Sequence, residues 1–182
     1  MCLSIHCIVS PIRKQQKSVI KKSISTTAME EIKCPNAVIL PEIVRLMNEG
    51  HTITLRLRGY SMRPFLEDNR DKALMTKATH PQIGDPVLAK IAPRHYVLHR
   101  IISIDHDQVT LRGDGNIGTE LCRLSDIKGA VIGFYRKGRE KLDRTDGKKW
   151  KIYSWIWTRL FPVRRYLLAF YRRIWIPVFG TV

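Results

Sequence analysis

Among the residues whose types could do chemistry is a serine in a turn, Ser61, within the segment Gly59-Tyr60-Ser61-Met62-Arg63-Pro64-Phe65. The preceding residues, Thr52 to Arg58, alternate between polar and apolar side chains, which predicts a half-buried strand. Glycine and proline then favour a turn at the end of that strand. A serine there projects from the strand end, which suits a nucleophile, although serines are common in turns that have no catalytic role.

A serine hydroxyl needs a neighbouring base to take its proton, and two residues are considered for that role, His99 and Lys90. Neutral imidazole, with a reference pKa of about 6.5, can accept a proton near neutral pH, whereas a lysine would need a strongly depressed pKa. A lone histidine at a strand end is more often a surface or hydrogen-bonded structural residue. The base role of His99 therefore depends on the residues around it.

Four short segments around these residues share the order of the signature boxes of type I signal peptidases. They are Gly59-x-Ser61-Met62-x-Pro64, Gly84-Asp85-Pro86-Val87, His99-Arg100-Ile101-Ile102 and Gly113-Asp114-Gly115-Asn116. Each box alone is weak, but four boxes in the family's order and spacing are specific, and they extend over some two-fifths of the chain. The chain therefore resembles the superfamily of signal peptidases and LexA-type proteins, which are serine peptidases. Lys90 does not fall at that family's base position.

The base separates two branches of that superfamily. Bacterial signal peptidases and LexA-type proteins pair the serine with a lysine, whereas endoplasmic-reticulum-type and sporulation-type enzymes have a histidine in its place. Because His99 stands directly before Arg-Ile-Ile, this chain resembles the histidine branch. The resemblance implies a serine endopeptidase that cleaves a leader or signal peptide after small residues through an acyl-enzyme, with Ser61 as nucleophile and His99 as base.

A histidine base usually needs an acidic partner, and the sequence offers two. Asp114 belongs to the last box and is expected to act as active-site scaffold or orienter, although an Asp-Gly turn residue that bonds its own backbone is also plausible there. The endoplasmic-reticulum branch places its triad aspartate six residues further on, where this chain has Glu120, one methylene longer. The sequence leaves the choice between the two acids open.

The resemblance also assigns the surroundings of the substrate. The backbone N–H of Ser61 is the expected oxyanion donor, as in the family. Gly59 leaves no side-chain hydroxyl two residues before the nucleophile, where some bacterial enzymes have one. Met62 is expected to pack beneath the substrate cleft, which is compatible with an ordinary core position.

The pattern along the chain predicts a mainly β fold with a helical, basic and aromatic C-terminal extension. Apolar residues at helical spacing predict a helix near residues 40–49. Strands are expected at 52–58, 73–76, 86–91, 96–104, 108–112 and 127–136, separated by turns. Short strands at such spacing favour an antiparallel, partly closed barrel or sandwich, which agrees with the antiparallel β-fold of the signal-peptidase and LexA-type superfamily.

The chain divides into four predicted segments. Residues 1–36 are expected to be a disordered basic leader, within which Met29 is a candidate true start. Residues 37–138 are the peptidase-like domain, and residues 139–149 are a charged linker. Residues 150–182 form a basic aromatic tail, which Pro162 and Pro177 are expected to divide into two helix-sized pieces.

The charge of the chain is +16, with 32 basic against 16 acidic residues, which favours polyanionic partners. The tail, residues 150–182, interleaves its tryptophans with cations and has no acidic residue, as expected for helices on an anionic membrane surface. The alternative is a helical extension that packs its aromatic side chains on the β domain. No nucleic-acid-binding module is recognisable, so nucleic acid is not a favoured partner. The resemblance to signal peptidases implies a peptide or preprotein substrate.

The expected location is the cytoplasm or the surface of a membrane. No segment reaches the roughly 20 apolar residues that span a bilayer, and the first cations follow the apolar residues, the reverse of a secretory signal. The scattered cysteines and histidines lack zinc spacing, so no metal or cofactor is expected. Two alternatives stay open: an inactive peptidase-like module that binds membrane or polyanion, and a LexA-type self-cleaving regulator, which the short segment before Ser61 disfavours.

Overall fold

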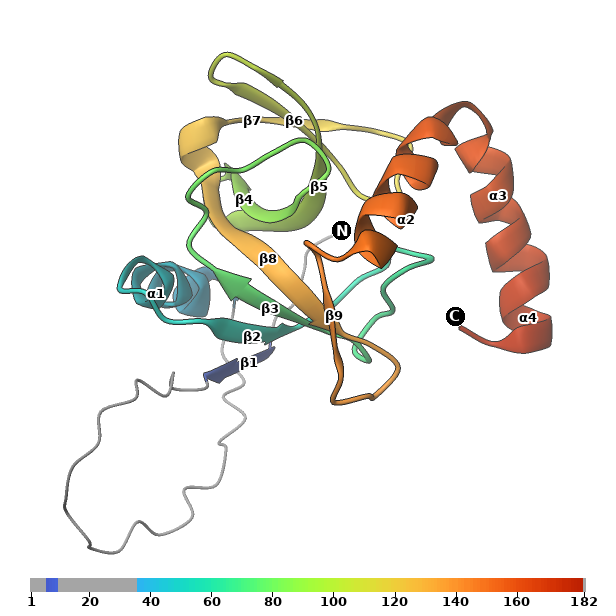
Figure 1. The fold of residues 1–182 in the computed structure, drawn as a ribbon, viewed down its shortest axis with the longest axis horizontal. Helices are drawn as coiled ribbons and strands as arrows, with labels where there is room; N and C mark the ends of the chain where they lie inside the picture. The colour runs from blue at the N-terminus through green and yellow to red at the C-terminus, as the bar shows by residue number, and fades with distance from the viewer. Residues whose placement is uncertain (1–5, 10–35, 182) are drawn as a thin grey trace, which may run out of the picture.

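The molecule is built around one antiparallel sheet (Figure 1). The computed structural model describes residues 6–9 and 36–181. Its strands are β1 (His6–Val9), β2 (Ile53–Arg56), β3 (Lys72–Thr76), β4 (Pro86–Ala92), β5 (His95–Asp105), β6 (Gln108–Arg112), β7 (Glu120–Arg123), β8 (Ile127–Tyr135) and β9 (Leu142–Arg144). They lie in the order β1-β2-β3-β8-β4-β5-β6-β7, with β9 paired to β8 outside this path. The predicted mainly β fold is confirmed, and the sheet is open, since none of the described ladders joins β1 to β7.

Alternating side chains explain the strands that the sequence predicted. In β2, Ile53 and Leu55 are fully buried, while the residues between and after them are partly exposed. β3 repeats this pattern with Ala73 and Met75 on the buried face. Successive side chains of a strand point to opposite faces, so one face of this part of the sheet packs into the core.

The strand β1 corrects the expectation of a wholly disordered leader over residues 1–36. Residues 6–9 pair with β2, from His6 opposite Arg56 to Val9 opposite Ile53. The free edge of β2 supplies backbone hydrogen-bond partners that a local sequence pattern cannot reveal. Asn36, the last residue of that predicted leader, begins a helix, and residues 1–5 and 10–35 lie outside the described residues.

The predicted charged linker, residues 139–149, is also corrected. It contains the strand β9, in which Arg144 pairs with Gly133 of β8, and its last residues begin the helix α2. A side chain on Gly133 would come within 2.7 Å of Leu142, so this glycine provides the space into which Leu142 packs. The segment is mostly charged, so its composition did not predict the packing of Leu142 on Gly133.

The helix α1 (Asn36–Asn48) confirms the helix expected near residues 40–49 and covers β2, β3 and β8. Leu40, Ile43 and Met47 follow helical spacing and are buried. Met47 lies so close to Gly129 of β8 that a methyl group there would come within 2.8 Å of its terminal carbon. Helix and sheet therefore meet at a glycine, where the backbones can approach closely.

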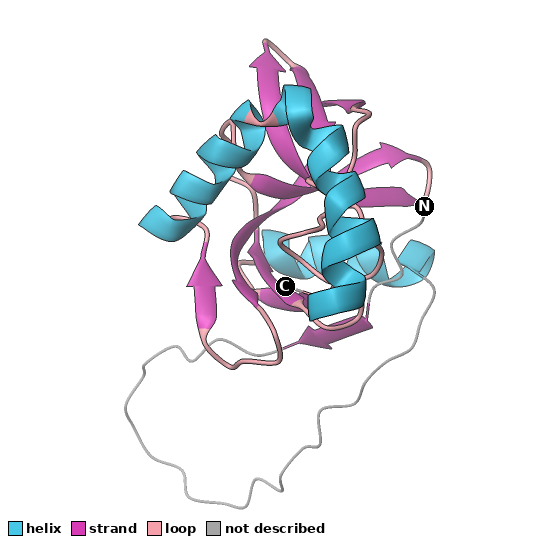
Figure 2. Ribbon diagram, turned by 90° about the vertical axis from the view of Figure 1, so that its right-hand side faces the viewer, coloured by secondary structure: helices cyan, strands magenta, loops and turns pink. Residues whose placement is uncertain are grey.

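The C-terminal helices lie on the opposite side of the molecule from α1 (Figures 1 and 2). They are α2 (Lys148–Arg159), α3 (Arg164–Phe170) and α4 (Ile176–Phe179), with a 3₁₀ turn at Phe161–Val163 and a π turn at Tyr171–Trp175. The predicted break at Pro162 is present between α2 and α3. The predicted break at Pro177 is wrong, because the wider π turn precedes this proline and the helical path continues into α4.

Candidate active site

Ser61 lies in the loop between β2 and β3, directly after a glycine-initiated turn. Gly59 has a φ of +95°, which favours glycine, and its N–H donates to Asp68 Oδ1 at 2.7 Å. The N–H of Arg63 donates to Tyr60 O at 3.2 Å, which closes a turn around the serine. The turn predicted from glycine and proline is therefore present, and it leaves Ser61 partly exposed.

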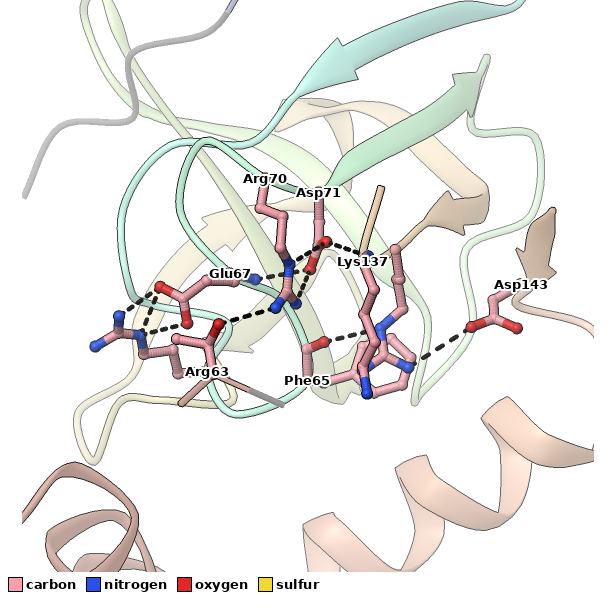
Figure 3. A network of polar contacts seen from close by, with 9 residues as sticks. Arg63, Phe65, Glu67, Arg70, Asp71, Lys137 and Asp143 are labelled. Atoms are coloured by element: carbon pink, nitrogen blue, oxygen red, sulfur yellow. Dashed lines mark hydrogen bonds and ion pairs between the residues drawn. The ribbon is translucent and has the colours of Figure 1, made fainter. Parts of the chain in front are cut away.

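A network of carboxylates and cations holds the loop after Ser61 (Figure 3). Arg63 Nε donates to Glu67 Oε2 at 2.9 Å, and the Glu67 N–H donates to Asp71 Oδ2 at 2.9 Å. Asp71 is fully buried and also accepts from Arg70 and from the N–H of Lys137. Because hydrogen bonds to charged groups are among the stronger ones, this network restricts the loop that carries the serine.

His99 is buried in the long strand β5, where it stands opposite Val87 of β4. Its Nδ1 lies 2.5 Å from Oε2 of Glu120, the first residue of β7. With an ionised glutamate as acceptor, Nδ1 carries the proton and Nε2 keeps a free lone pair. Of the two acids considered from the sequence, Glu120 is therefore the one that reaches the histidine.

Gly113 lies between Ser61 and His99 and brings them into one site. A methyl group on Gly113 would come 2.4 Å from the backbone oxygen of Ser61 and 3.0 Å from His99 Nε2. The serine segment and the unbonded face of the imidazole therefore meet at this glycine. Within the described residues, Ser61 Oγ makes no hydrogen bond to the ring, and a missing bond of this kind is common in the free form of serine–histidine pairs.

Asp114 is occupied by a different partner. Arg100 donates to both of its carboxylate oxygens, at 2.9 and 2.7 Å, and both side chains are almost completely buried. Burial opposes the charge of Arg100, but Asp114 more than offsets this effect, so the pKa of Arg100 is raised. Asp114 thus holds residues 113–116, the last of the four sequence boxes, in place without contacting His99.

The helix α2 completes the surroundings of Asp114. The hydroxyl of Tyr153 donates to Asp114 Oδ2 at 3.0 Å, and the indole N–H of Trp157 donates to Asp114 O at 3.0 Å. Burial and the adjacent carboxylate raise the pKa of Tyr153 well above its usual value. The sequence pattern did not assign Tyr153 or Trp157 to the site, because their role depends on the buried Arg100–Asp114 pair, which the pattern does not reveal.

The other sequence candidates occupy supporting positions. Met62 is buried in the hydrophobic core, and a small cavity next to Ser61 is lined mainly by apolar side chains, among them Met62, Leu66 and Leu98. Lys90 lies farther along β4, opposite Tyr96, three positions beyond the Val87–His99 pair. The structure therefore brings together Ser61, His99 and Glu120, while Gly59, Met62 and Asp114 support the surrounding backbone.

The described ranges, 6–9 and 36–181, contain no group of three or more histidine, cysteine or acidic side chains that could hold a metal ion. Over the same ranges, every helix is too short or too polar to cross a bilayer. The chain matches no family model, no curated protein and no solved structure.

Proposed function

We propose that this protein is a serine endopeptidase in which Ser61 is the nucleophile, His99 the general base and Glu120 the acid that orients the base. The observation that carries this proposal is the position of the imidazole. Its Nδ1 is bonded to Glu120 and its Nε2 faces Gly113, the residue that also contacts Ser61. The proposed substrate is a leader or signal peptide, in keeping with the resemblance of the four boxes to those of signal peptidases.

The proposed reaction has two halves. His99 Nε2 takes the proton of the Ser61 hydroxyl as its oxygen attacks the scissile carbonyl, and the imidazolium then gives this proton to the leaving amine. Water attacks the resulting ester with the same base, which releases the acid product and restores the serine. Glu120 fixes the Nδ1–H tautomer and stabilises the imidazolium, and the N–H of Ser61 is the proposed oxyanion donor.

The experiment that tests this proposal compares Ser61→Ala and His99→Ala with the unchanged protein on a library of leader peptides, with cleavage read by mass spectrometry. Both variants are expected to lose hydrolysis, because each lacks one partner of the proton transfer. Ser125→Ala and His106→Ala, which replace exposed residues of the same types, serve as controls. Unchanged hydrolysis in the Ser61 and His99 variants would contradict the proposal.

A second function, docking on an anionic membrane surface, is favoured by the outer faces of the C-terminal helices. Large apolar side chains are exposed there, among them Trp155, Tyr166, Phe170, Ile174, Val178 and Phe179. The tail has no acidic residue, and the exposed cations Arg159 and Arg173 lie between the apolar side chains. Exposed rings next to cations suit the boundary between lipid tails and anionic headgroups. The proposed location is therefore the surface of a membrane.

Vesicle sedimentation tests this second function. Phosphatidylglycerol vesicles are expected to retain the protein, and phosphatidylcholine vesicles to retain much less. The double variant Phe170→Asp, Val178→Asp is expected to lose binding, while Leu121→Asp, at an exposed apolar residue of β7, retains it. Equal binding by the two variants, or a preference for single-stranded nucleic acid over vesicles, would contradict membrane docking.

A further inference from the structure

A surface groove runs beside the candidate catalytic residues, and the site described so far does not use it. One wall is the loop from Gly115 to Thr119 with Glu120 after it, and the other wall is the helical stretch α3 and its π turn. The helical residues that line the groove are Arg165, Leu168, Ala169 and Arg172. Their offsets of three, four and seven residues place them on one face, so the helix lies lengthwise along the groove.

The groove is connected to both candidate catalytic residues. Gly115, in the loop wall of the groove, donates its N–H to the backbone oxygen of Ser61 at 2.7 Å. Glu120, at the end of the same wall, bonds His99 Nδ1. A peptide held at Ser61 and His99 therefore has the groove directly beside it.

The charge of the groove is positive. Arg165 and Arg172 are both exposed, and neither has a carboxylate partner among the residues that the structure describes. Arg172 donates to the backbone oxygen of Gly115 at 3.1 Å, and Arg165 lies 4.7 Å from the Tyr166 ring. The one acid of the lining, Glu120, is engaged with His99. Two cations are therefore available to a ligand.

We propose that this groove is a substrate subsite that binds a peptide segment with acidic side chains, through Arg165 and Arg172. This inference rests on the proposed peptidase function, since it assigns the groove to that enzyme's substrate. The seven-residue offset separates the two arginine positions by about 10 Å along the helix axis. A peptide in the polyproline II conformation advances about 9 Å in three residues and returns to the same face, so two acidic residues three positions apart match the two cations.

The test measures binding without hydrolysis, with the Ser61→Ala protein and a fluorescent peptide that contains Glu-Ala-Ala-Glu. At low ionic strength this peptide is expected to bind about three- to tenfold more tightly than its Gln-Ala-Ala-Gln counterpart, with the difference lost in high salt. Arg165→Gln is expected to remove most of the difference. Arg173→Gln, the same change at an exposed arginine outside the groove, is the matched control and retains it.

Two results overturn the subsite. One is equal affinity for the glutamate and glutamine peptides, and the other is an equal loss of that difference in Arg165→Gln and Arg173→Gln, which would show general attraction to a basic protein. These results are independent of the peptidase function. If the unchanged protein cleaves library peptides without preference for acidic ones, the subsite falls and the peptidase stands. If the acidic peptide binds in the groove but no peptide is cleaved, the peptidase falls, and with it the groove's role as a substrate subsite.

Discussion

Glu120 and Asp114 have different partners, although both are acids within six residues of each other in sequence. Glu120 contacts the imidazole of His99, and Asp114 contacts the guanidinium of Arg100. In the proposed mechanism Glu120 orients His99 and stabilises its imidazolium, while Asp114 fixes the backbone next to Ser61. Substitutions at single positions can therefore separate the two roles.

Glu120→Gln is expected to lower kcat/KM by a factor on the order of 10² to 10⁴, because an amide cannot stabilise the imidazolium and permits the wrong tautomer. Peptide hydrolysis measures this effect. Glu120→Asp is expected to retain part of the activity, and Glu140→Gln, at an exposed glutamate, is the control. Activity of the Glu120→Gln variant within twofold of the unchanged protein would exclude Glu120 from the mechanism.

Gly113→Ala is expected to reduce hydrolysis strongly and to destabilise the fold by about 1–3 kcal/mol. The added methyl would come 2.4 Å from a backbone oxygen, which cannot move aside as a flexible side chain would. Gly118→Ala is the matched control for stability, since nothing lies within 4 Å of its added carbon. Urea denaturation measures the loss of stability and peptide hydrolysis the loss of activity, and equal stability of the two variants would contradict the close contact.

Among the secondary-structure elements, α2 supports the site from outside the sheet, because Tyr153 and Trp157 both donate to Asp114. The composition of this helix, aromatic and basic, is equally typical of a membrane-surface helix. One face in fact packs on the β domain, with Trp150 and Trp157 buried, while Trp155 on the other face is exposed. Packing on the β domain thus accounts for one face of α2, and membrane docking of the exposed face stays a proposal.

Tyr153→Phe is expected to reduce the free energy of unfolding by about 1 kcal/mol at pH 8, through the lost hydrogen bond to Asp114. Burial and Asp114 raise the pKa of Tyr153, so the folded state favours the neutral phenol. This contribution is fully present below the unfolded-state pKa of about 10 and is lost as the pH rises through the folded-state pKa. The difference between the two proteins is therefore expected to shrink above about pH 10.

Urea denaturation at pH 8 and at higher pH measures this trend. Tyr166→Phe, at an exposed tyrosine of the same helical tail, is the control and is expected to change stability little at either pH. A difference for Tyr153→Phe that grows with pH would contradict the assigned partner.

The sheet and the serine turn could be predicted because they depend on local patterns. Alternation predicts β2, and glycine and proline predict the turn at Ser61. The choice of Glu120 as the partner of His99 depends on strand register, since the β6–β7 ladder places Glu120 opposite Leu111. Register between strands is set by the whole sheet, so no local pattern could decide between the two acids.

At the scale of the whole molecule, the helix α2 is part of the core. Trp150 belongs to the main hydrophobic cluster and lies 4.7 Å from Phe65 in the loop after the serine, measured between ring centroids. Arg100 lies 4.6 Å from the Trp150 ring. The hydrophobic core of the β domain is therefore incomplete without α2.

A chain that ends after Gly147 is expected to be unfolded or strongly destabilised, because removal of α2 exposes the Arg100–Asp114 pair and the core next to Trp150. A chain that ends after Leu160 keeps α2 and is expected to fold with lower stability. Circular dichroism during thermal unfolding distinguishes the two. Equal melting curves for the full chain and for the chain that ends after Gly147 would contradict the dependence of the fold on α2.

The dependence of Asp114 on α2 has a consequence for protein synthesis. Tyr153 and Trp157 are synthesised after the segments that carry Ser61 and His99. A nascent chain therefore lacks the α2 donors to Asp114 until α2 has left the ribosome. Folding of the candidate site is thus expected to follow the synthesis of α2 rather than that of the strands.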